Sequence, residues 1–189
     1  MAWYIKVNGS GAAVGHIDLP TNTKPLTVAK GDKVWFKPAT LTKPTPGAYQ
    51  TLSGPVYDID AGTITYTAND VSLADAKASK KAELAALRYD EEIGGITVGG
   101  VSIDTDRDTQ AKMIAVRILA KEDALYTVNW KSTSGFVTLN AATIIALADA
   151  VSDHIQNCFD NESTHTTAID ALTTVAAVAS YDITTRWPS

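Results

Sequence analysis

Residues 71–107 read VSLADAKASKKAELAALRYDEEIGGITVGGVSIDTDR, and within this stretch the chain changes from one kind of sequence to another. It holds a run of helix formers that ends at Gly94 and Gly95, then an alternating apolar segment, then an acidic segment that can cap a helix. The sequence before it is typical of strands and loops, whereas the sequence after it is mostly typical of helices. We therefore predict an α+β protein, with a small N-terminal β module followed by a mainly helical domain that contains two β-hairpins.

The first half of this stretch predicts a helix within residues 69–94. Asn69 or Asp70 can cap its N-terminus, and Ser72 with Asp75 forms a second capping pattern. The helix has one partly apolar stripe, with the lysines at positions 77, 80 and 81 largely off it: Leu73, Ala76, Leu84, Leu87 and Ile93. Because a lysine stands at position 80, the stripe falls short of a coiled-coil heptad. The helix can therefore pack within its domain or align with copies of itself.

Two further hairpins are predicted after this helix. Residues 96–98 and 101–103 alternate about a glycine pair, and residues 126–130 and 136–139 alternate about a turn at positions 132–135. Between the hairpins, Asp106 or Asp108 can cap a helix that includes Met113 and Leu119.

The last part of the chain is predicted to be helical. Asn140 can cap the most apolar helix, over residues 141–159, and a polar break over residues 160–167 precedes a last helix over residues 168–179.

The N-terminal part predicts short strands. Residues 3–7 and 14–19 predict a hairpin about Asn8 and Gly9, and residues 56–60 and 63–67 predict another. Residues 24–36 predict short strands around a turn, and the proline-rich residues 37–54 predict an extended surface loop. We expect three parts: a β-rich attachment module at 1–68, a connecting helix at 69–94 and a helical α+β domain at 95–189.

Charge and composition exclude several classes of protein. The chain has 189 residues and a net charge of -5, which argues against a nucleic-acid binder because phosphate contacts need a basic surface. No apolar run reaches the roughly 20 residues that span a bilayer, so we expect no membrane insertion. The single cysteine, Cys158, cannot form an intramolecular disulfide, and we find no signal peptide at the N-terminus. Both observations fit synthesis in a reducing cytoplasm.

Candidate catalytic and metal-binding patterns are weak. Asp104, Asp106 and Asp108 open like a calcium loop, but the glycine and glutamate that such a loop needs are absent, so helix capping is favoured. His154 and Cys158 share a helical face, yet a zinc site needs further ligands, so packing is favoured. The carboxylates at positions 90–92 are typical of a solvated helix end. We predict no catalytic residue, no metal and no cofactor.

Large apolar side chains mark where the chain can contact partners. We expect Trp130 and Trp187 to lie in the core, with Trp187 fixing the C-terminus to the helical body; if exposed instead, either could anchor a protein interface. The small β module has little room for a core, so we expect it to pack against a neighbouring domain or an oligomeric partner. The residues that we predict as a possible interface are Trp3, Tyr4, Trp35, Phe36, Leu73, Leu84 and Leu87.

The order of features from Lys80 onward resembles a C-terminal domain of uncharacterised function found on bacteriophage tail-fibre and tail-fibre-assembly proteins. The matching pieces are KAELAALR at 81–88, VGGVSIDTD at 98–106, VNWK at 128–131, FVTLNA at 136–141, the helix with His154, and the terminal Trp187 and Pro188. GTITYT at 62–67 with DVSL at 70–73 is similar to the linker that often joins such domains to a β-rich head.

This resemblance implies a place in the phage tail, or a service to it, and no catalytic residues. The first hypothesis is a structural subunit of the virion, at the baseplate or fibre, that contacts other tail proteins and is made in the host cytoplasm. Fibres are commonly three-fold, so the resemblance implies a homo-oligomer and favours a trimer. The alternative is a fibre-assembly chaperone that is absent from the mature virion. A polysaccharide-acting tail enzyme is a third and weaker hypothesis, since no paired carboxylates stand in an evident cleft context.

Overall fold

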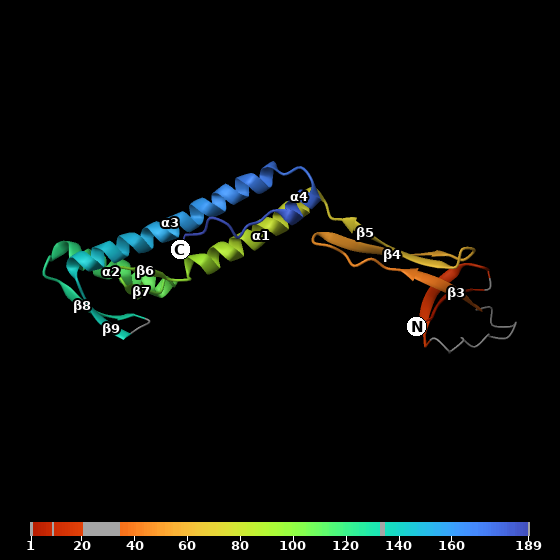
Figure 1. The fold of residues 1–189 in the computed structure, drawn as a ribbon, viewed down its shortest axis with the longest axis horizontal. Coiled ribbons are helices and arrows are strands. Elements are labelled where there is room, and N and C mark those ends of the chain that lie inside the picture. Colours follow the sequence, from red (N-terminus) through yellow and green to blue (C-terminus); the bar gives the residue numbers. More distant parts are fainter. Residues whose placement is uncertain (1, 9, 21–34, 133–134, 189) are drawn as a thin grey trace. The chain divides into compact units, whose positions relative to one another are not determined.

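The computed structural model describes residues 2–8, 10–20, 35–132 and 135–188, and it confirms the predicted α+β class. The chain divides into two compact units, Met1–Ser72 and Leu73–Ser189, and each unit has its own core (Figure 1). The helix that we expected to connect the parts, α1 (Leu73–Glu92), belongs to the second unit and packs there against two other helices. No helix in the described ranges is both long enough and apolar enough to cross a bilayer.

The first unit is a five-stranded sheet in which the strands follow the order β2-β1-β3-β5-β4. Both predicted hairpins are confirmed, as the antiparallel pairs β1–β2 and β4–β5. In the first, the Asn8 side-chain oxygen accepts the backbone N–H groups of Ser10 and Ala12 at 3.1 and 2.9 Å, while Gly9 lies outside the described residues. The strands are β1 (Ala2–Val7), β2 (Ala13–Leu19), β3 (Trp35–Thr42), β4 (Gln50–Asp58) and β5 (Thr63–Asp70).

The predicted surface loop over residues 37–54 is wrong, because β3 and the start of β4 occupy much of it. Proline lacks a backbone N–H, so a strand tolerates it where one edge has no ladder partner. β3 pairs with β1 up to Ala39 and with β5 only from Thr40, so Pro38 lies where the register pairs one edge of the strand. The short strands predicted over residues 24–36 lie largely outside the described residues, apart from the start of β3.

Pro55, just after this region, lies in an irregular part of β4. Gly54 and Pro55 fall where the β4–β5 register shifts, and β4 is an edge strand, which is where bulges and prolines are tolerated. A Cβ atom added at Gly54, which has a φ of +115°, would lie 2.9 Å from the Thr65 carbonyl oxygen. The close approach of the two strands therefore requires glycine here.

The core of the first unit is small. Ile5, Val7 and Ile64 are fully buried, and half-buried residues of all five strands or their connections pack against them: Trp3, Ala13, Ala39, Leu41, Tyr57, Ile59 and Tyr66. The His16 Nδ1 atom of β2 lies 2.9 Å from the Tyr57 hydroxyl of β4, although these are the two edge strands. The sheet therefore curls around its core until side chains of its edges meet.

The second unit contains the helices and both predicted small hairpins, β6–β7 and β8–β9, which are confirmed. The predicted caps are also confirmed: Asp106 accepts the backbone N–H groups of Asp108 and Thr109, and Asn140 accepts that of Thr143. Its elements are α1, β6 (Ile96–Val98), β7 (Val101–Ile103), α2 (Arg107–Glu122), β8 (Thr127–Ser132), β9 (Gly135–Asn140), α3 (Ala141–Ala171) and α4 (Val175–Ser180).

The predicted break over residues 160–167 is wrong, because α3 runs through it without interruption and the last helix is the short α4. The polar segment contains neither Gly nor Pro, so nothing in its backbone chemistry ends the helix. The hydroxyl groups of Thr164 and Thr167 donate to carbonyl oxygens one turn earlier in α3, at 2.9 and 3.0 Å. These polar side chains are thus satisfied within a helix.

α1 and α3 lie side by side and run antiparallel (Figure 1). At one end, Lys77 Nζ donates to the Asp170 carbonyl at 2.8 Å and Lys81 pairs with the Asp170 carboxylate at 2.6 Å. Lys80, which we placed largely off the packed stripe, is buried, and its Nζ pairs with Glu83 at 3.2 Å. A lysine can take such a position because its long aliphatic stem packs while the amine keeps a partner.

α2 packs against the N-terminal part of α3 and completes the core of the second unit. The buried members of this core are Ile103, Met113, Ala120, Leu139, Ala141, Ile144, Leu147, Ala148 and Val151. Trp130, which we expected in the core, is half-buried and packs against it.

Candidate functional site

The predicted interface residues are divided between the two units. Trp3 and Tyr4 are half-buried neighbours on β1, so they point to opposite faces of the strand, and Trp3 shares its face with the buried Ile5. Trp35 and Phe36 begin β3, but their side chains lie outside the described residues.

On α1, the three predicted leucines differ in exposure. Leu84 is fully buried within its own unit, which leaves it no surface for a partner, whereas Leu73 and Leu87 are half-buried. Whether the exposed parts of these residues contact a partner stays a prediction.

Aromatic side chains meet at one part of the first unit. The His16 ring lies 5.3 Å from the Trp3 ring and 5.8 Å from the Tyr57 ring, and Lys43 Nζ lies 5.1 Å from the centre of the Tyr66 ring. Burial raises the pKa of Tyr57, and the neighbouring Tyr66 adds to the effect. Trp3, Tyr57 and Tyr66 all pack on the small core of the first unit, so this group chiefly completes that core.

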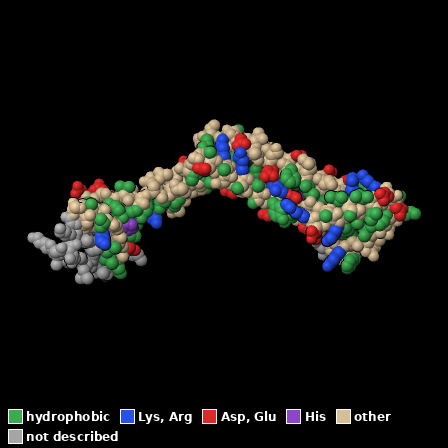
Figure 2. Space-filling model, turned by 180° about the vertical axis from the view of Figure 1, so that it is seen from behind, with side chains coloured by type: hydrophobic (Ala, Val, Ile, Leu, Met, Phe, Trp, Pro, Cys, Tyr) green, Lys and Arg blue, Asp and Glu red, His purple; other side chains and the backbone are tan. Residues whose placement is uncertain are grey.

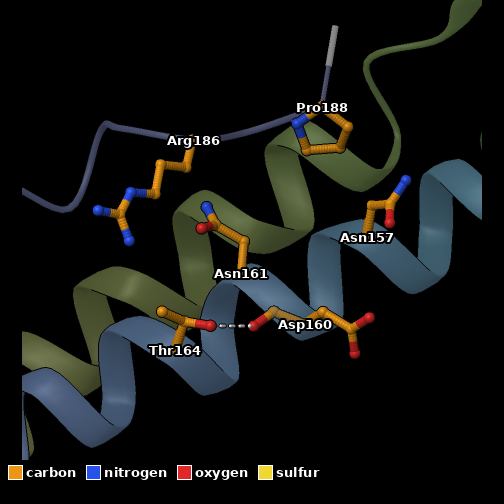
Figure 3. Close-up of a pocket in the computed structure, with 6 residues that line it drawn as sticks. All are labelled: Asn157, Asp160, Asn161, Thr164, Arg186 and Pro188. Carbon is orange, nitrogen blue, oxygen red and sulfur yellow. Dashed lines mark hydrogen bonds between the residues drawn. The ribbon is translucent and has the colours of Figure 1, made fainter.

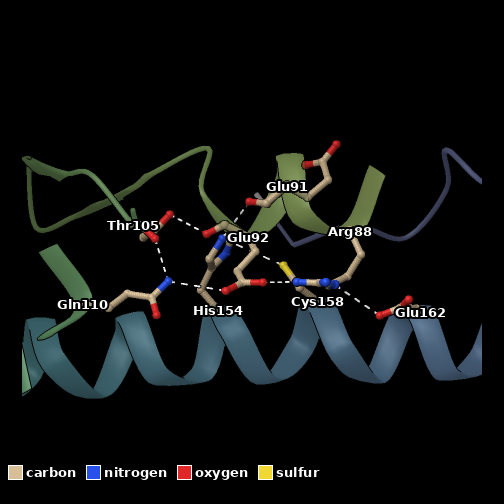
Figure 4. A network of polar contacts seen from close by, with 8 residues as sticks. All are labelled: Arg88, Glu91, Glu92, Thr105, Gln110, His154, Cys158 and Glu162. Carbon is tan, nitrogen blue, oxygen red and sulfur yellow. Dashed lines mark hydrogen bonds and ion pairs between the residues drawn. The ribbon is translucent and has the colours of Figure 1, made fainter. Parts of the chain in front are cut away.

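A buried polar network joins α1 to α3 (Figure 4). Arg88 forms ion pairs with Glu92 on its own helix and with Glu162 on α3, the latter through Nε at 3.1 Å. Its guanidinium also lies 4.6 Å from the centre of the Phe159 ring. Arg88 and Glu92 are largely buried, so each charge depends on the other for its compensation.

Thr105 ties this network to the segment between β7 and α2 (Figure 4). Its hydroxyl donates to the Glu92 carbonyl at 2.5 Å and accepts the Gly95 backbone N–H at 2.9 Å. The Gln110 side-chain amide donates to the Thr105 carbonyl at 2.7 Å. The Thr105 hydroxyl therefore joins the end of α1 to the first glycine turn, and the backbone carbonyl of the same residue holds the start of α2.

His154 and Cys158 lie in the same interface, as the predicted helical spacing required (Figure 4). His154 Nε2 lies 3.0 Å from the Glu91 carbonyl, so this nitrogen carries the hydrogen and donates. Burial raises the pKa of the Cys158 thiol to about 11, with Glu91 and Glu92 adding to the effect. The thiol is therefore protonated at neutral pH, and both side chains serve packing between the helices. Across the described part of the chain, no group of three or more His, Cys, Asp or Glu residues is placed to hold a metal ion.

The structure shows helix capping by Asp106, which we favoured over a calcium loop. One Asp106 carboxylate oxygen accepts the Asp108 and Thr109 N–H groups at 2.9 and 3.1 Å, and the other accepts the Thr109 hydroxyl at 2.6 Å. These hydrogen bonds, led by that of the Thr109 hydroxyl, lower the pKa of Asp106. Asp106 is thus a capping residue of α2.

The C-terminal segment packs on the polar half of α3, which the sequence did not reveal. His165 Nε2 donates to the Thr185 carbonyl at 3.0 Å, so Nδ1 accepts the Tyr181 hydroxyl at 2.8 Å in the neutral ring. Asn161 also donates to the Thr185 carbonyl, at 3.1 Å. Trp187 is half-buried and stacks on the His165 ring, with 6.2 Å between ring centres. This stacking docks the C-terminus on α3, as predicted for Trp187, but the ring is only half-buried and lies outside the main core in which we expected it.

A polar pocket of ≈ 390 Å³ lies beside this segment (Figure 3). It is lined by Asn157, Asp160, Asn161, Thr164, Arg186 and Pro188. The Asn161 amide is already used by Thr185, and the Asp160 carbonyl accepts the Thr164 hydroxyl. The pocket is open and two of its polar groups are engaged within the chain, so its shape assigns no ligand.

The most distinctive surface of the second unit is apolar. Five large apolar side chains on α2, the following loop and β9 are exposed, and Figure 2 shows hydrophobic surface over this part of the unit: Ile114, Ile118, Leu119, Leu125 and Phe136. A narrow groove of ≈ 120 Å³ runs between α2 and α3 beside Ile114 and Ile118. Its floor is formed by Met113, Ala148 and Val151, and Ile155 stands on its α3 side.

The sequence of α2 already indicates this surface. Apolar residues of α2 occupy more than one face, because Met113 and Ile114 are neighbours, as are Ile118 and Leu119. A single helix buries only one such face against its own core, so the remaining apolar residues had to be exposed.

The comparisons with known proteins give one match. A family model described as "Domain of unknown function (DUF4376)" matches residues 75–185. No curated protein and no solved structure matches the chain.

Proposed function

The chain belongs to the DUF4376 family through residues 75–185, and on that premise we propose that it is a structural protein of a bacteriophage tail that acts through protein–protein contacts. The placement in a phage tail, at the baseplate or fibre, rests on the resemblance of residues 80–189 to a domain of tail-fibre and fibre-assembly proteins. The partners are then other tail proteins and further copies of the chain, and the location is the virion.

The observation that carries the proposal is the exposed apolar surface of the second unit. Leu125 is 88% exposed in the loop after α2 and Phe136 is 75% exposed on β9, in addition to the exposed isoleucines of α2. Single exposed apolar side chains are common, but a group of them marks a surface that binds another protein. Large aliphatic and aromatic side chains contribute most to the free energy of binding, because a partner removes their apolar surface from water.

The internal structure of the second unit supports a role as a rigid subunit. The Arg88 network joins α1 to α3, the Thr105 hydroxyl holds the end of α1 to the first glycine turn, and the C-terminal segment packs on α3. Buried polar groups with all their partners in place favour one arrangement over alternatives. Such a unit can present a fixed surface to its neighbours.

Quantitative mass spectrometry of purified particles tests this proposal. For a phage that encodes this chain, we expect the protein in purified virions at a fixed number of copies per particle. A protein that is abundant in the infected lysate and absent from purified particles would instead support the fibre-assembly chaperone.

A charged substitution tests whether incorporation into particles depends on the exposed apolar surface. Phe136→Asp places a charge on the exposed surface and should lower the amount of protein in particles at least roughly tenfold, because a charge buried in a contact without a partner is costly. Phe136→Leu is the matched control and should keep most of the incorporation. Equal incorporation of both variants would contradict a contact at Phe136.

A further inference from the structure

A cavity of ≈ 410 Å³ lies between α2 and β8, and it shares no residue with the apolar groove between α2 and α3. Thr109, Lys112 and Val116 line it from α2, where their spacing places them on one face of the helix. Asp104 and the four consecutive residues 128–131 of β8 complete the lining. Because consecutive residues of a strand point to opposite faces, the cavity runs along the edge of β8. Its volume is that of a small-molecule site, which is roughly 300–1,000 Å³.

Polar groups of β8 beside this cavity have no partner within the described part of the chain. β8 pairs only with β9, so alternate backbone N–H and C=O groups along its other edge form no hydrogen bond with a described residue. The indole N–H of Trp130 also has no such partner, whereas that of Trp187 donates to the Ile183 carbonyl at 2.9 Å. The cavity therefore offers both donors and acceptors to a ligand.

Two lysines place positive charge at the cavity. Lys112 and Lys131 both line it, and neither forms an ion pair with a described residue. The pKa of Asp106 is lowered first by its hydrogen bonds to Thr109 and to a smaller extent by Lys112, but this carboxylate is occupied by the capping of α2. Asp104 is the single carboxylate of the lining, so the lining is positive in a chain of net charge -5. Such a cavity attracts an anion.

The remaining residues of the lining are apolar. Val116, Val128 and Trp130 are half-buried and pack against the core of the second unit, which holds them in place. An aromatic ring with a fixed position and an unpartnered N–H suits a ligand that has an apolar face and polar edges.

We propose that this cavity binds an acidic sugar, a saccharide ring that carries a carboxylate. The carboxylate pairs with Lys112 and Lys131, and the C–H face of the ring lies against Trp130. A sugar hydroxyl both donates and accepts, which matches a strand edge that presents N–H and C=O groups alternately. This site goes beyond the proposed function, because it needs no protein partner.

A titration of the full-length chain with sodium glucuronate, followed by ¹⁵N–¹H NMR, tests the proposal. We expect the Trp130 indole signal to shift with a Kd of about 1–10 mM, while the engaged indole of Trp187 stays in place. Glucose, which lacks the carboxylate, and acetate, which lacks the ring, should each bind at least ~10-fold more weakly. Benzoate should also bind more weakly, because it has no hydroxyl groups for the edge of β8.

Lysine variants test the role of the charge. Lys112→Gln and Lys131→Gln should each raise the glucuronate Kd by roughly 3- to 10-fold, because each removes a charge-assisted hydrogen bond. Lys121→Gln is the matched control, since Lys121 is an exposed lysine of α2 that does not line the cavity, and its Kd should stay within about twofold. Far-UV circular dichroism of each variant checks that the helices are retained.

Four results would overturn the proposal: no shift of the Trp130 indole signal at about 100 mM glucuronate, equal binding of glucose or acetate, tighter binding of benzoate, or an equal loss in Lys121→Gln. Absence of the protein from virions would contradict the proposed function and leave this site untouched.

Discussion

At the scale of single residues, Cys158 shows how burial sets chemistry. The thiol is fully buried beside His154, and removal from water raises its pKa from 9.0 to about 11. A thiolate is disfavoured in the folded state because the low-dielectric interior solvates the charge poorly and because the carboxylates of Glu91 and Glu92 repel it. The residue is a small packing group under ordinary conditions.

This shift predicts a pH dependence of stability. The folded pKa lies above the unfolded one, so the contribution of the protonated thiol is fully present below pH 9 and is lost as the pH rises toward 11. Between these values, the free energy of unfolding should fall by on the order of 1–2 kcal/mol more in the natural protein than in Cys158→Ala. Urea unfolding at pH 8 and pH 10.5 measures the difference. Parallel losses in both proteins would show that the thiol does not titrate as described.

Individual residues were predictable where their role is local. The capping by Asp106 and Asn140 follows from their positions before helical runs, and the shared face of His154 and Cys158 follows from helical spacing. The partners of His154 and Thr105 could not be found in the same way. They lie on other elements, and only the packing of α3 on α1 brings Glu91 to His154.

At the scale of elements, α3 depends on the chain that follows it. Its first half is apolar and packs in the core, whereas its second half carries the buried polar residues Asn161 and His165. Their partners are Tyr181 and Thr185, so the C-terminal segment replaces water for these groups. From the sequence, this polar half was predicted to interrupt the helix. The helical pattern of α3 alone does not show that a later segment supplies hydrogen-bond partners for its polar side chains.

Changes in the C-terminal segment should therefore act on one half of α3. Trp187→Ala removes the ring stacked on His165 and should lower amide protection across residues 160–171 by roughly tenfold or more, a change expected for local opening at a few kcal/mol below global unfolding. Residues 141–155 should keep their protection because their partners belong to the main core. Hydrogen exchange followed by mass spectrometry makes the measurement. Tyr181→Phe, which loses one hydroxyl, should show a smaller effect in the same segment.

The hairpins were the most predictable elements, because glycine turns and alternating side chains are local signals. β3 was missed because its strand character comes from pairing with β1 and β5, both of which are remote from its own prolines. Local chemistry favoured a loop there, and tertiary pairing outweighed it.

At the scale of the whole molecule, the chain is two structures with separate cores. The core of the first unit is formed within residues 3–66, and that of the second within residues 96–155. The α+β class and the change near residue 71 were readable from the sequence. The exposed apolar side of α2 was not, because exposure is decided by which faces the rest of the unit covers.

Separate cores predict that the second unit folds without the first. A fragment of residues 73–189 should retain its helical circular dichroism and melt within about 5 °C of the corresponding transition in the full chain, a shift equivalent to about 1 kcal/mol. Both melts should be recorded at equal molar concentration, because any association makes the melting temperature depend on concentration. A fragment without a cooperative melt would show that the first unit is needed for its stability.

The mixed pairing of β3 bears on how the protein is made. β3 pairs with β1 of the first hairpin on one side and runs parallel to β5 on the other. The sheet is therefore complete only after β5, which ends at Asp70, has been synthesised. About 50 residues separate this strand from the first hairpin, which takes roughly 3–10 s to translate at ordinary ribosome speeds. An isolated two-stranded hairpin is only marginally stable in water. The first hairpin is therefore made seconds before β5, which carries the core residue Ile64, can join the sheet and complete that core.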